Sequence, residues 1–170
     1  MNTDQNIEVQ IVKSEEDIQR VATLASEIWH EYFPFILKEE QINYMVEKFQ
    51  SAHAIKDQFE DGYEYYKIIA DNNLVGYFSI RKDKEDKTLF LSKLYIHKSS
   101  RGRGYGTYVF DFIKGYSLER SLSKIWLTVN KYNESTINAY IKKGFYISDT
   151  RVLDIGAGYI MDDYIMEWEL

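Results

Sequence analysis

The sequence contains no cysteine, a single proline and only three histidines among its 170 residues. Without cysteine the chain can form no disulfide, no thiolate zinc site and no cysteine nucleophile. The histidines His30, His53 and His97 do not have the spacing of metal ligands, so we expect no metal site.

Long apolar runs are also missing. No stretch approaches the roughly 20 residues that cross a bilayer, and the opening MNTDQNIEVQ lacks the basic flank and apolar core of a secretory signal. We therefore expect a cytoplasmic protein with no membrane partner.

The composition is that of a folded globule. Hydrophobic residues make up 45% of the chain, charged residues 28% and aromatic residues 16%, a balance that excludes a disordered chain. The length is close to that of one domain, and no repeat, linker or low-complexity tract interrupts it. We expect a single domain over residues 1–170.

The formal net charge of −6 disfavours nucleic acid as a partner, because an acidic surface repels a phosphate backbone. The exception is a short basic stretch from Lys98 to Arg103. One such island in an acidic chain favours a single bound anion over a nucleic acid.

Hydrophobic periodicity divides the chain into alternating structural segments. Strands are expected over residues 7–12, 65–71, 74–83, 88–98 and 124–130, with two more between residues 145 and 170. A first helix begins at the N-cap Ser14, with Asp17 three residues later, and runs to Glu31. Further helices are expected around residues 42–49, in a short segment before residue 62, and over residues 104–119 and 134–143.

This order predicts an α/β fold with a mixed, mainly antiparallel sheet of about seven strands flanked by helices. The strand, helix and strand between residues 89 and 130 should form one locally parallel pair.

Three glycines, Gly102, Gly104 and Gly106, alternate with larger residues where the helix over residues 104–119 begins. A tight turn explains one or two glycines, but three in alternation exceed that need. Without Cβ atoms a ligand can approach the backbone, and amides at a helix N-terminus bind anions. Arg101 and Arg103 can add positive charge, so this segment predicts a phosphate or pyrophosphate site.

Two common phosphate motifs do not fit this segment. A Walker loop needs a lysine directly after its last glycine, and the next lysine is Lys114. The dinucleotide fingerprint needs glycine or alanine where Thr107 stands. The motif that fits is RxxGxG, formed by Arg101, Gly104 and Gly106.

In this motif the sequence resembles the GCN5-related N-acetyltransferases (GNAT). The stretch NKYNESTINAYIKKGF is similar to the second hallmark of that family, with Asn133, Tyr140, Gly144 and Phe145 at the matching places. The order of elements is similar over the whole chain, and the tail resembles the bacterial small-amine and polyamine branch.

The resemblance implies that the chain binds acetyl-CoA. It assigns the pyrophosphate to the segment made of Arg101, Gly102, Arg103, Gly104, Tyr105, Gly106 and Thr107. It also implies that the preceding strand splays from its parallel neighbour, so that the backbone of Leu94, Tyr95 and Ile96 binds the pantetheine arm. Asn133 would contact that arm from the other side.

The reaction implied is acetyl transfer, by direct attack, to the primary amine of a small molecule such as a polyamine, or of a peptide. The resemblance makes Tyr140 the group that protonates the leaving thiolate. Members of this fold are frequently homodimers, although no segment of this sequence marks an interface.

The general base stays open. Many relatives carry a glutamate on the strand before the glycines, but here that strand reads TLFLSKLYIHK and has no carboxylate. Glu27, His30, Glu31, His97 and ordered water are the candidates.

The adjacent Asp162 and Asp163 point to opposite faces of an extended chain, so at most one of them should face a pocket and pair with a cationic amine. A solvent-facing acidic turn is the alternative. A non-catalytic acyl-CoA-binding or sensory module is the alternative function. The missing strand glutamate favours it, whereas the presence of Tyr140 and Asn133 argues against it.

Overall fold

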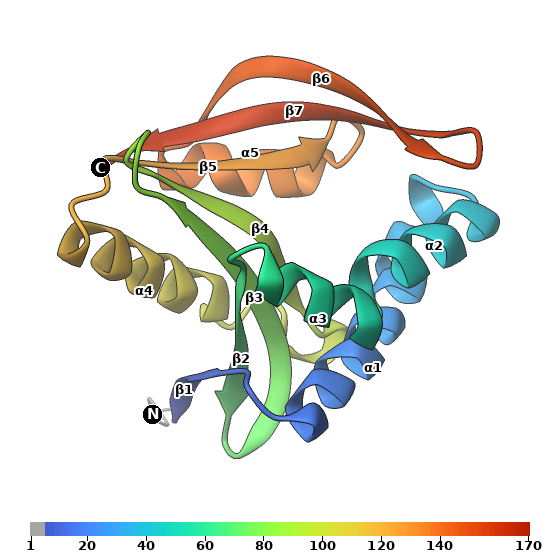
Figure 1. The fold of residues 1–170 in the computed structure, drawn as a ribbon, viewed down its shortest axis with the longest axis horizontal. Helices are drawn as coiled ribbons and strands as arrows, with labels where there is room; N and C mark the ends of the chain where they lie inside the picture. Colours follow the sequence, from blue (N-terminus) through green and yellow to red (C-terminus); the bar gives the residue numbers. More distant parts are fainter. Residues whose placement is uncertain (1–5) are drawn as a thin grey trace. The chain divides into compact units, whose positions relative to one another are not determined.

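The computed structural model describes residues 6–170, and its elements follow the predicted order (Figure 1). The first half contains β1 (Ile7–Ile11), α1 (Glu15–Tyr32), the 3-10 turn η1 (Phe33–Phe35), α2 (Glu39–Met45), the π-helical turn η2 (Val46–Gln50), α3 (Ala52–Glu60), β2 (Glu64–Ala70) and β3 (Asn73–Asp83). The second half contains β4 (Thr88–Ile96), the 3-10 turn η3 (Lys98–Ser100), α4 (Tyr105–Glu119), β5 (Lys124–Asn130), α5 (Glu134–Lys143), β6 (Tyr146–Gly156) and β7 (Tyr159–Glu169).

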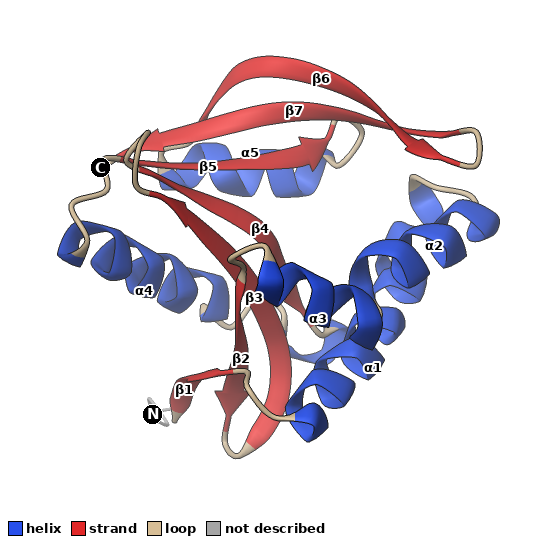
Figure 2. Ribbon diagram, in the orientation of Figure 1, coloured by secondary structure: helices blue, strands red, loops and turns tan. Residues whose placement is uncertain are grey.

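The strands of residues 6–170 are ordered β1-β2-β3-β4-β5-β7-β6 in one sheet (red in Figure 2). The pairs β1–β2, β2–β3, β5–β7 and β6–β7 are antiparallel, whereas β4 and β5 are parallel. This confirms the predicted α/β fold with a mixed, mainly antiparallel sheet. None of the helices in the described range is long and apolar enough to cross a membrane.

The chain divides into two compact units, which are described in turn. The first comprises the residues up to Arg81 together with Lys93–Ile113, and the second comprises Lys82–Ser92 with Lys114–Leu170.

In the first unit, α1 begins where the sequence predicts. The hydroxyl of Ser14 accepts a hydrogen bond from the Asp17 amide at 3.1 Å, which satisfies one of the free amides of the first turn. The predicted apolar face of the helix is buried; it consists of Ile18, Val21, Leu24, Ala25 and Ile28.

The hairpin β2–β3 of this unit packs against helices on both faces. Successive side chains of each strand alternate between these two faces. Tyr65 and Tyr77 lie in the core cluster that α1 and α3 supply. Tyr66 and Phe78 lie on the other face and pack edge-on against Phe112 of α4.

The segment after α1 departs from the expected continuous helix around residues 42–49. The α-helix ends at Met45, a wider π-helical turn covers Val46–Gln50, and α3 begins after Ser51, whose hydroxyl caps it. The wide turn buries Gln50, and its Oε1 accepts a hydrogen bond from the Tyr77 hydroxyl at 2.8 Å.

In the second unit, α5 is held close to β7. Its C-cap Gly144 has a φ of 111°, and a Cβ there would lie 3.2 Å from the Trp168 indole nitrogen. Glycine is therefore needed both for the left-handed backbone and for the close approach. The Phe145 ring packs on Trp168 at 5.5 Å.

Candidate functional site

The glycine-rich segment forms an open turn between β4 and α4. Gly102 and Gly104 have φ values of 75° and 83°, in the region that favours glycine. A Cβ added to Gly102, Gly104 or Gly106 would meet no described atom within 4 Å. The backbone at these positions is therefore accessible, which is compatible with a bound phosphate group.

The start of α4 adds a positive field to that turn. Tyr108 is the first residue whose amide bonds back to the turn, at 3.2 Å from the Gly104 carbonyl. Amides of a first helical turn have no carbonyl partner within their own helix, and together with the helix dipole they attract anions. Lys98 and Arg103 beside the turn are exposed.

Whereas the side chains of Lys98 and Arg103 are exposed, that of Arg101 contacts other protein groups. Its guanidinium forms two hydrogen bonds with the Glu31 carboxylate, its Nε donates to the Ile96 carbonyl at 2.9 Å, and it lies 5.0 Å from the Tyr32 ring centre. These contacts hold the side chain against the end of α1. Lys98 and Arg103 are therefore the exposed cations beside the glycines.

The His97 side chain is also held by hydrogen bonds to other groups of the protein. Its Nδ1 lies 3.2 Å from the Ser99 amide, which can only donate, and its Nε2 lies 2.8 Å from Glu27. The network therefore favours the tautomer with the proton on Nε2. His97 thus contacts Glu27 through Nε2 and the loop through Nδ1.

The residues expected to bind the pantetheine arm lie at the end of β4. Leu94, Tyr95 and Ile96 are half-buried, and the Tyr95 ring packs against Tyr77 at 5.6 Å. A Cβ on Gly76 of β3 would lie 2.5 Å from the Tyr95 carbonyl. Glycine at position 76 thus lets β3 and the end of β4 approach closely.

The parallel pairing of β4 with β5 is short. It joins Thr88, Leu89 and Phe90 to Lys124, Ile125 and Trp126, and both strands continue beyond these residues. A short register of this kind is what a splayed parallel pair requires.

Asn133 and Tyr140 lie on α5 in the second unit. Asn133 is the buried N-cap residue, and its amide donates to the Asn130 carbonyl at 3.0 Å. Tyr140 is half-buried, with its ring 5.5 Å from Phe145. Seven residues correspond to nearly two helical turns, so Asn133 and Tyr140 share one side of α5.

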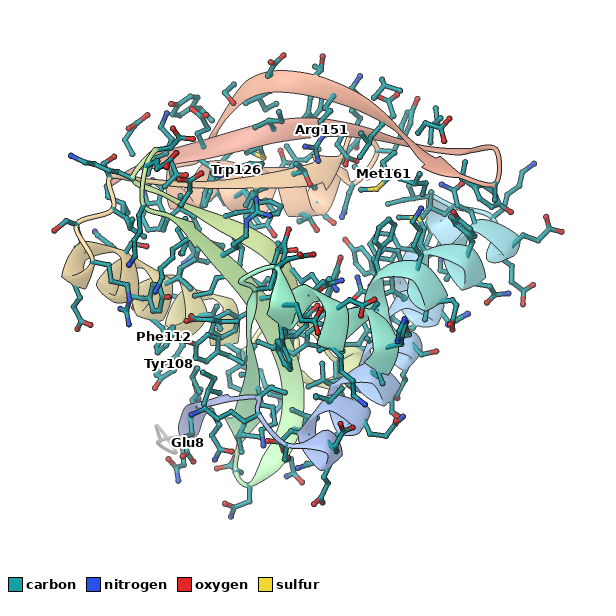
Figure 3. The ribbon with its side chains drawn as sticks, in the orientation of Figure 1. Glu8, Tyr108, Phe112, Trp126, Arg151 and Met161 are labelled. Atoms are coloured by element: carbon teal, nitrogen blue, oxygen red, sulfur yellow. The ribbon has the colours of Figure 1, made fainter. Side chains whose placement is uncertain are left out.

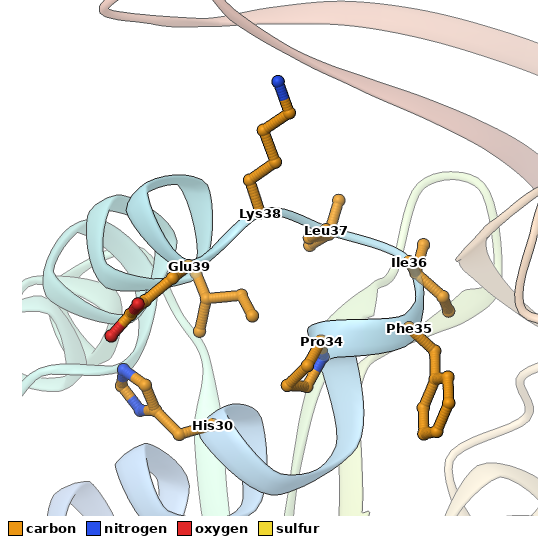
Figure 4. Close-up of a pocket in the computed structure, with 8 residues that line it drawn as sticks. His30, Pro34, Phe35, Ile36, Leu37, Lys38 and Glu39 are labelled. Atoms are coloured by element: carbon orange, nitrogen blue, oxygen red, sulfur yellow. The ribbon is translucent and has the colours of Figure 1, made fainter.

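A pocket of about 650 Å³ lies where α1 ends and α2 begins (Figure 4). Its lining consists of His30, Pro34, Phe35, Ile36, Leu37, Lys38, Glu39 and Ile42. Phe35 is 97% exposed and is the most exposed of the large apolar side chains.

His30 at this pocket has an acceptor beside each of its two ring nitrogens. Its Nδ1 lies 2.8 Å from the Ser26 carbonyl and its Nε2 lies 2.5 Å from the Asn43 side-chain oxygen. These two acceptors raise the pKa of His30, and the nearby Glu39 carboxylate, which faces it in Figure 4, raises it further. Since both ring nitrogens face acceptors, neither is placed to take a proton from an amine, so this arrangement does not favour His30 as a base.

Sequence reasoning missed the buried Lys93 of β4. Its amine contacts the Phe49 carbonyl, the Gln58 side chain and the Tyr65 hydroxyl, and burial lowers its pKa to about 7. In the pattern SKLYI this lysine looks like an ordinary surface residue. Leu89, Leu91 and Lys93 are two residues apart and so lie on one face of the strand. The burial of the two leucines was the available signal for the burial of Lys93.

The two acidic residues of β7 have different surroundings. Asp162 pairs with Lys131 at 2.7 Å, whereas Asp163 is buried, and desolvation raises its pKa to about 6. Asp163 is therefore the one of the pair that is withdrawn from solvent, as alternation along a strand allows.

A mixed sheet with one short parallel pair, followed by an open glycine turn at a helix N-terminus, is the arrangement that the sequence leads us to expect of an acyltransferase. The chain belongs to the acetyltransferase (GNAT) family, whose sequence model matches residues 21–145. It is thus an N-acetyltransferase that depends on acetyl-CoA.

Similar proteins agree with this family. An uncharacterized N-acetyltransferase of the pepI 3′ region in Lactobacillus delbrueckii subsp. lactis is 25% identical over 156 residues, which cover 87% of this chain and 90% of that protein. The PaiA N-acetyltransferase of Thermoplasma acidophilum, crystallised with coenzyme A, has a TM-score of 0.79 at 20% identity, covering 97% of this chain and 99% of that one. A spermidine N-acetyltransferase chimera of SpeG from Vibrio cholerae and hSSAT has a TM-score of 0.69 at 15% identity, covering 96% and 95%. These two structures share the fold.

Proposed function

We propose that this chain transfers the acetyl group of acetyl-CoA to the primary amine of a small molecule or a peptide, by direct attack of the amine. The observation that carries the proposal is the open glycine turn before α4, where three alternate positions without a Cβ leave the backbone accessible. The solved neighbours described as spermidine and PaiA N-acetyltransferases support an amine acceptor.

The backbone amides from Arg101 to Thr107 bind the diphosphate in this proposal, and Arg103 and Lys98 balance its charge. The backbone of Leu94, Tyr95 and Ile96 binds the pantetheine arm, and the Asn133 side chain contacts the same arm. When bound, acetyl-CoA supplies an acetyl group activated as a thioester.

An amide of the β4 backbone donates a hydrogen bond to the oxygen that becomes negative during attack. One such donor contributes about 3–4 kcal/mol in acyl transfer. Tyr140 donates its phenolic proton at the sulfur position as the C–S bond breaks. The nitrogen loses a second proton once the new C–N bond has formed, and this proton returns to the Tyr140 phenolate.

The amine must lose a proton before it attacks, because an ammonium group has no lone pair. Glu27, Glu31 and His97 are engaged in the contacts that join α1 to the β4–α4 loop, and both ring nitrogens of His30 face acceptors. Transfer of this proton to ordered water is therefore the route we favour.

The test is an acetylation assay with acetyl-CoA and a panel of spermidine, lysine, an aminoglycoside and a lysine-containing peptide. Released thiol can be followed with a thiol reagent, because a chain without cysteine gives no background. We expect thiol release that depends on at least one amine, and calorimetric binding of coenzyme A. Binding without turnover on any amine would favour the non-catalytic module, and absence of binding would overturn the cofactor site.

A further inference from the structure

Three side chains form a row across the last strands of the second unit. Asn130 of β5 is in register with Asp163 of β7, and Asp163 is in register with Arg151 of β6. Directly opposed residues of antiparallel strands have their side chains on the same face. Asn130, Asp163 and Arg151 therefore lie side by side on one face of the sheet.

Asp163 makes no hydrogen bond in this row, although the charge of Arg151 acts on it. Its residue is only 3% exposed, yet its carboxylate receives no hydrogen bond and forms no ion pair within residues 6–170. Asp162 differs, because its Oδ1 lies 2.7 Å from the Lys131 amine in an ion pair, although the two atoms do not have the geometry of a hydrogen bond. Buried polar groups are nearly always hydrogen-bonded in folded proteins, so an exception calls for a functional reason.

Arg151 is unsatisfied in the same place. Its Nε is buried and has no hydrogen-bond partner among the described residues, and no ion pair within 4.0 Å joins it to Asp163. Figure 3 labels Arg151 on the hairpin formed by β6 and β7. An anionic group and a cationic group thus stand next to each other with no hydrogen bond or ion pair between them.

The charges around the row sum to zero. Arg151 and Lys131 are cationic, Asp162 and Asp163 are anionic, and these are the charged groups that act on Asp163. Burial raises the pKa of Asp163 to about 6, so it is mainly ionised at neutral pH. A polycation would meet a guanidinium here as well as a carboxylate, whereas a molecule with one charge of each sign complements both.

The row is attached to the loop that precedes α5. The Asn130 carbonyl accepts from the Asn133 amide at 3.0 Å, and the Asp162 carbonyl accepts from the Lys131 amide at 3.1 Å. The same loop leads to Asn133 and Tyr140, which we assign to the thioester end of the cofactor. The row is therefore joined through its backbone to the loop that leads to the segment proposed to act at the sulfur.

We infer that Asp163 binds the ammonium group and Arg151 the carboxylate of the acceptor, so that the acceptor is a free amino acid. This inference rests on the proposed function, because it names the acceptor of that reaction. It separates amino acids from polyamines and aminoglycosides, which carry no carboxylate for Arg151.

The test compares amino acids with their decarboxylated partners: lysine with cadaverine, arginine with agmatine, and phenylalanine with phenethylamine. For the wild-type chain we expect kcat/KM to favour at least one amino acid over its partner by about tenfold or more, since a site built for a polar group rejects an analogue that lacks it. Arg151→Gln should abolish this preference, and Asp163→Asn should lower kcat/KM for both members of the pair.

Matched controls are Asp162→Asn and Lys131→Met, which remove the neighbouring, already paired charges. We expect these to change the preference by less than about twofold, because Asp162 lies on the other face of β7 and Lys131 is its ion-pair partner. Calorimetry of the preferred amino acid in the presence of coenzyme A gives a readout independent of turnover. Binding should be lost in Asp163→Asn and Arg151→Gln, while coenzyme A affinity stays unchanged in all four variants.

Two results overturn the inference and leave the proposed function intact: preference for the decarboxylated amines, or a preference for amino acids that survives in Arg151→Gln. If the wild-type chain acetylates no amine, the proposed function fails. Calorimetry then decides the ligand site by itself. Amino-acid binding that both substitutions abolish supports the site, and absence of such binding overturns it.

Discussion

Arg101 and Glu31, seventy residues apart in sequence, form a bidentate ion pair with nitrogen–oxygen distances of 3.2 and 2.8 Å. Each side chain is 33% exposed. The first residue of the RxxGxG segment therefore fastens the glycine turn to the end of α1. The side chain of Arg101 positions the cofactor loop through Glu31, whereas its backbone belongs to the proposed phosphate site.

Charge reversal tests this positioning role. Arg101→Glu and Glu31→Arg each place two like charges together, so we expect each single variant to bind coenzyme A about tenfold more weakly. The double variant should recover most of the affinity measured by calorimetry. A double variant that stays as weak as Arg101→Glu would instead assign the guanidinium to the phosphates.

Gly106→Val tests whether the glycines make room for a ligand. Gly106 has no atom near its missing Cβ and no left-handed φ, so valine should leave the free energy of unfolding unchanged or raise it by a few tenths of a kcal/mol. We expect coenzyme A affinity to fall about 100-fold, because the branched side chain would occupy the ligand's space. Gly115→Val is the matched control in the same helix and should leave affinity unchanged. Equal affinities for the two variants would contradict a site at this turn.

Tyr140→Phe removes only the hydroxyl group. The ring keeps its packing on Phe145, so folding and coenzyme A binding should be preserved. We expect turnover to fall by about 10²–10⁴, the usual contribution of a positioned acid. Tyr132→Phe, at an exposed tyrosine before the same helix, serves as the control. Unchanged turnover in Tyr140→Phe would remove this residue from the mechanism.

Lys93 should make stability depend on pH. Burial lowers its folded-state pKa to about 7 from 10.5, so between these values the unfolded chain binds one more proton than the folded chain. The contribution of Lys93 to the free energy of unfolding therefore rises with pH across this window, by at most about 1.4 kcal/mol per unit, and is flat below pH 7.

Urea unfolding of the wild type and Lys93→Met at pH 6, 7.5 and 9 measures this slope. The wild type should gain stability relative to the variant from pH 7.5 to 9. Lys98→Met, at an exposed lysine, should follow the wild type at every pH. Parallel curves for wild type and Lys93→Met would show that Lys93 keeps its proton in the folded chain.

Local signals in the sequence were sufficient for much of the fold. The Ser14 cap, the alternation on the hairpin strands and the turn at Asp71 and Asn72, both with positive φ, each act within a few residues. The open glycine turn was predictable for the same reason. Its amides and its missing Cβ atoms belong to one short segment.

Features that depend on distant partners were not predictable. Nothing near Arg101 in the sequence points to Glu31, and nothing near Lys93 points to the Phe49 carbonyl. Asp162 and Asp163 could be assigned to opposite faces, but which of them is buried depends on packing by other strands. Gly76 carried an unused signal, since an isolated glycine within a strand marks close backbone approach.

The π-helical turn at Val46–Gln50 has a consequence for how this chain can vary in length. It directs the Phe49 carbonyl to Lys93 and the Gln50 side chain to Tyr77, and both contacts depend on the extra residue that a wide turn accommodates. Deleting one residue here would restore a regular helix but rotate everything before it by about 100° relative to α3. Natural variants should thus exchange side chains in this segment freely at its exposed positions, yet keep its residue count fixed.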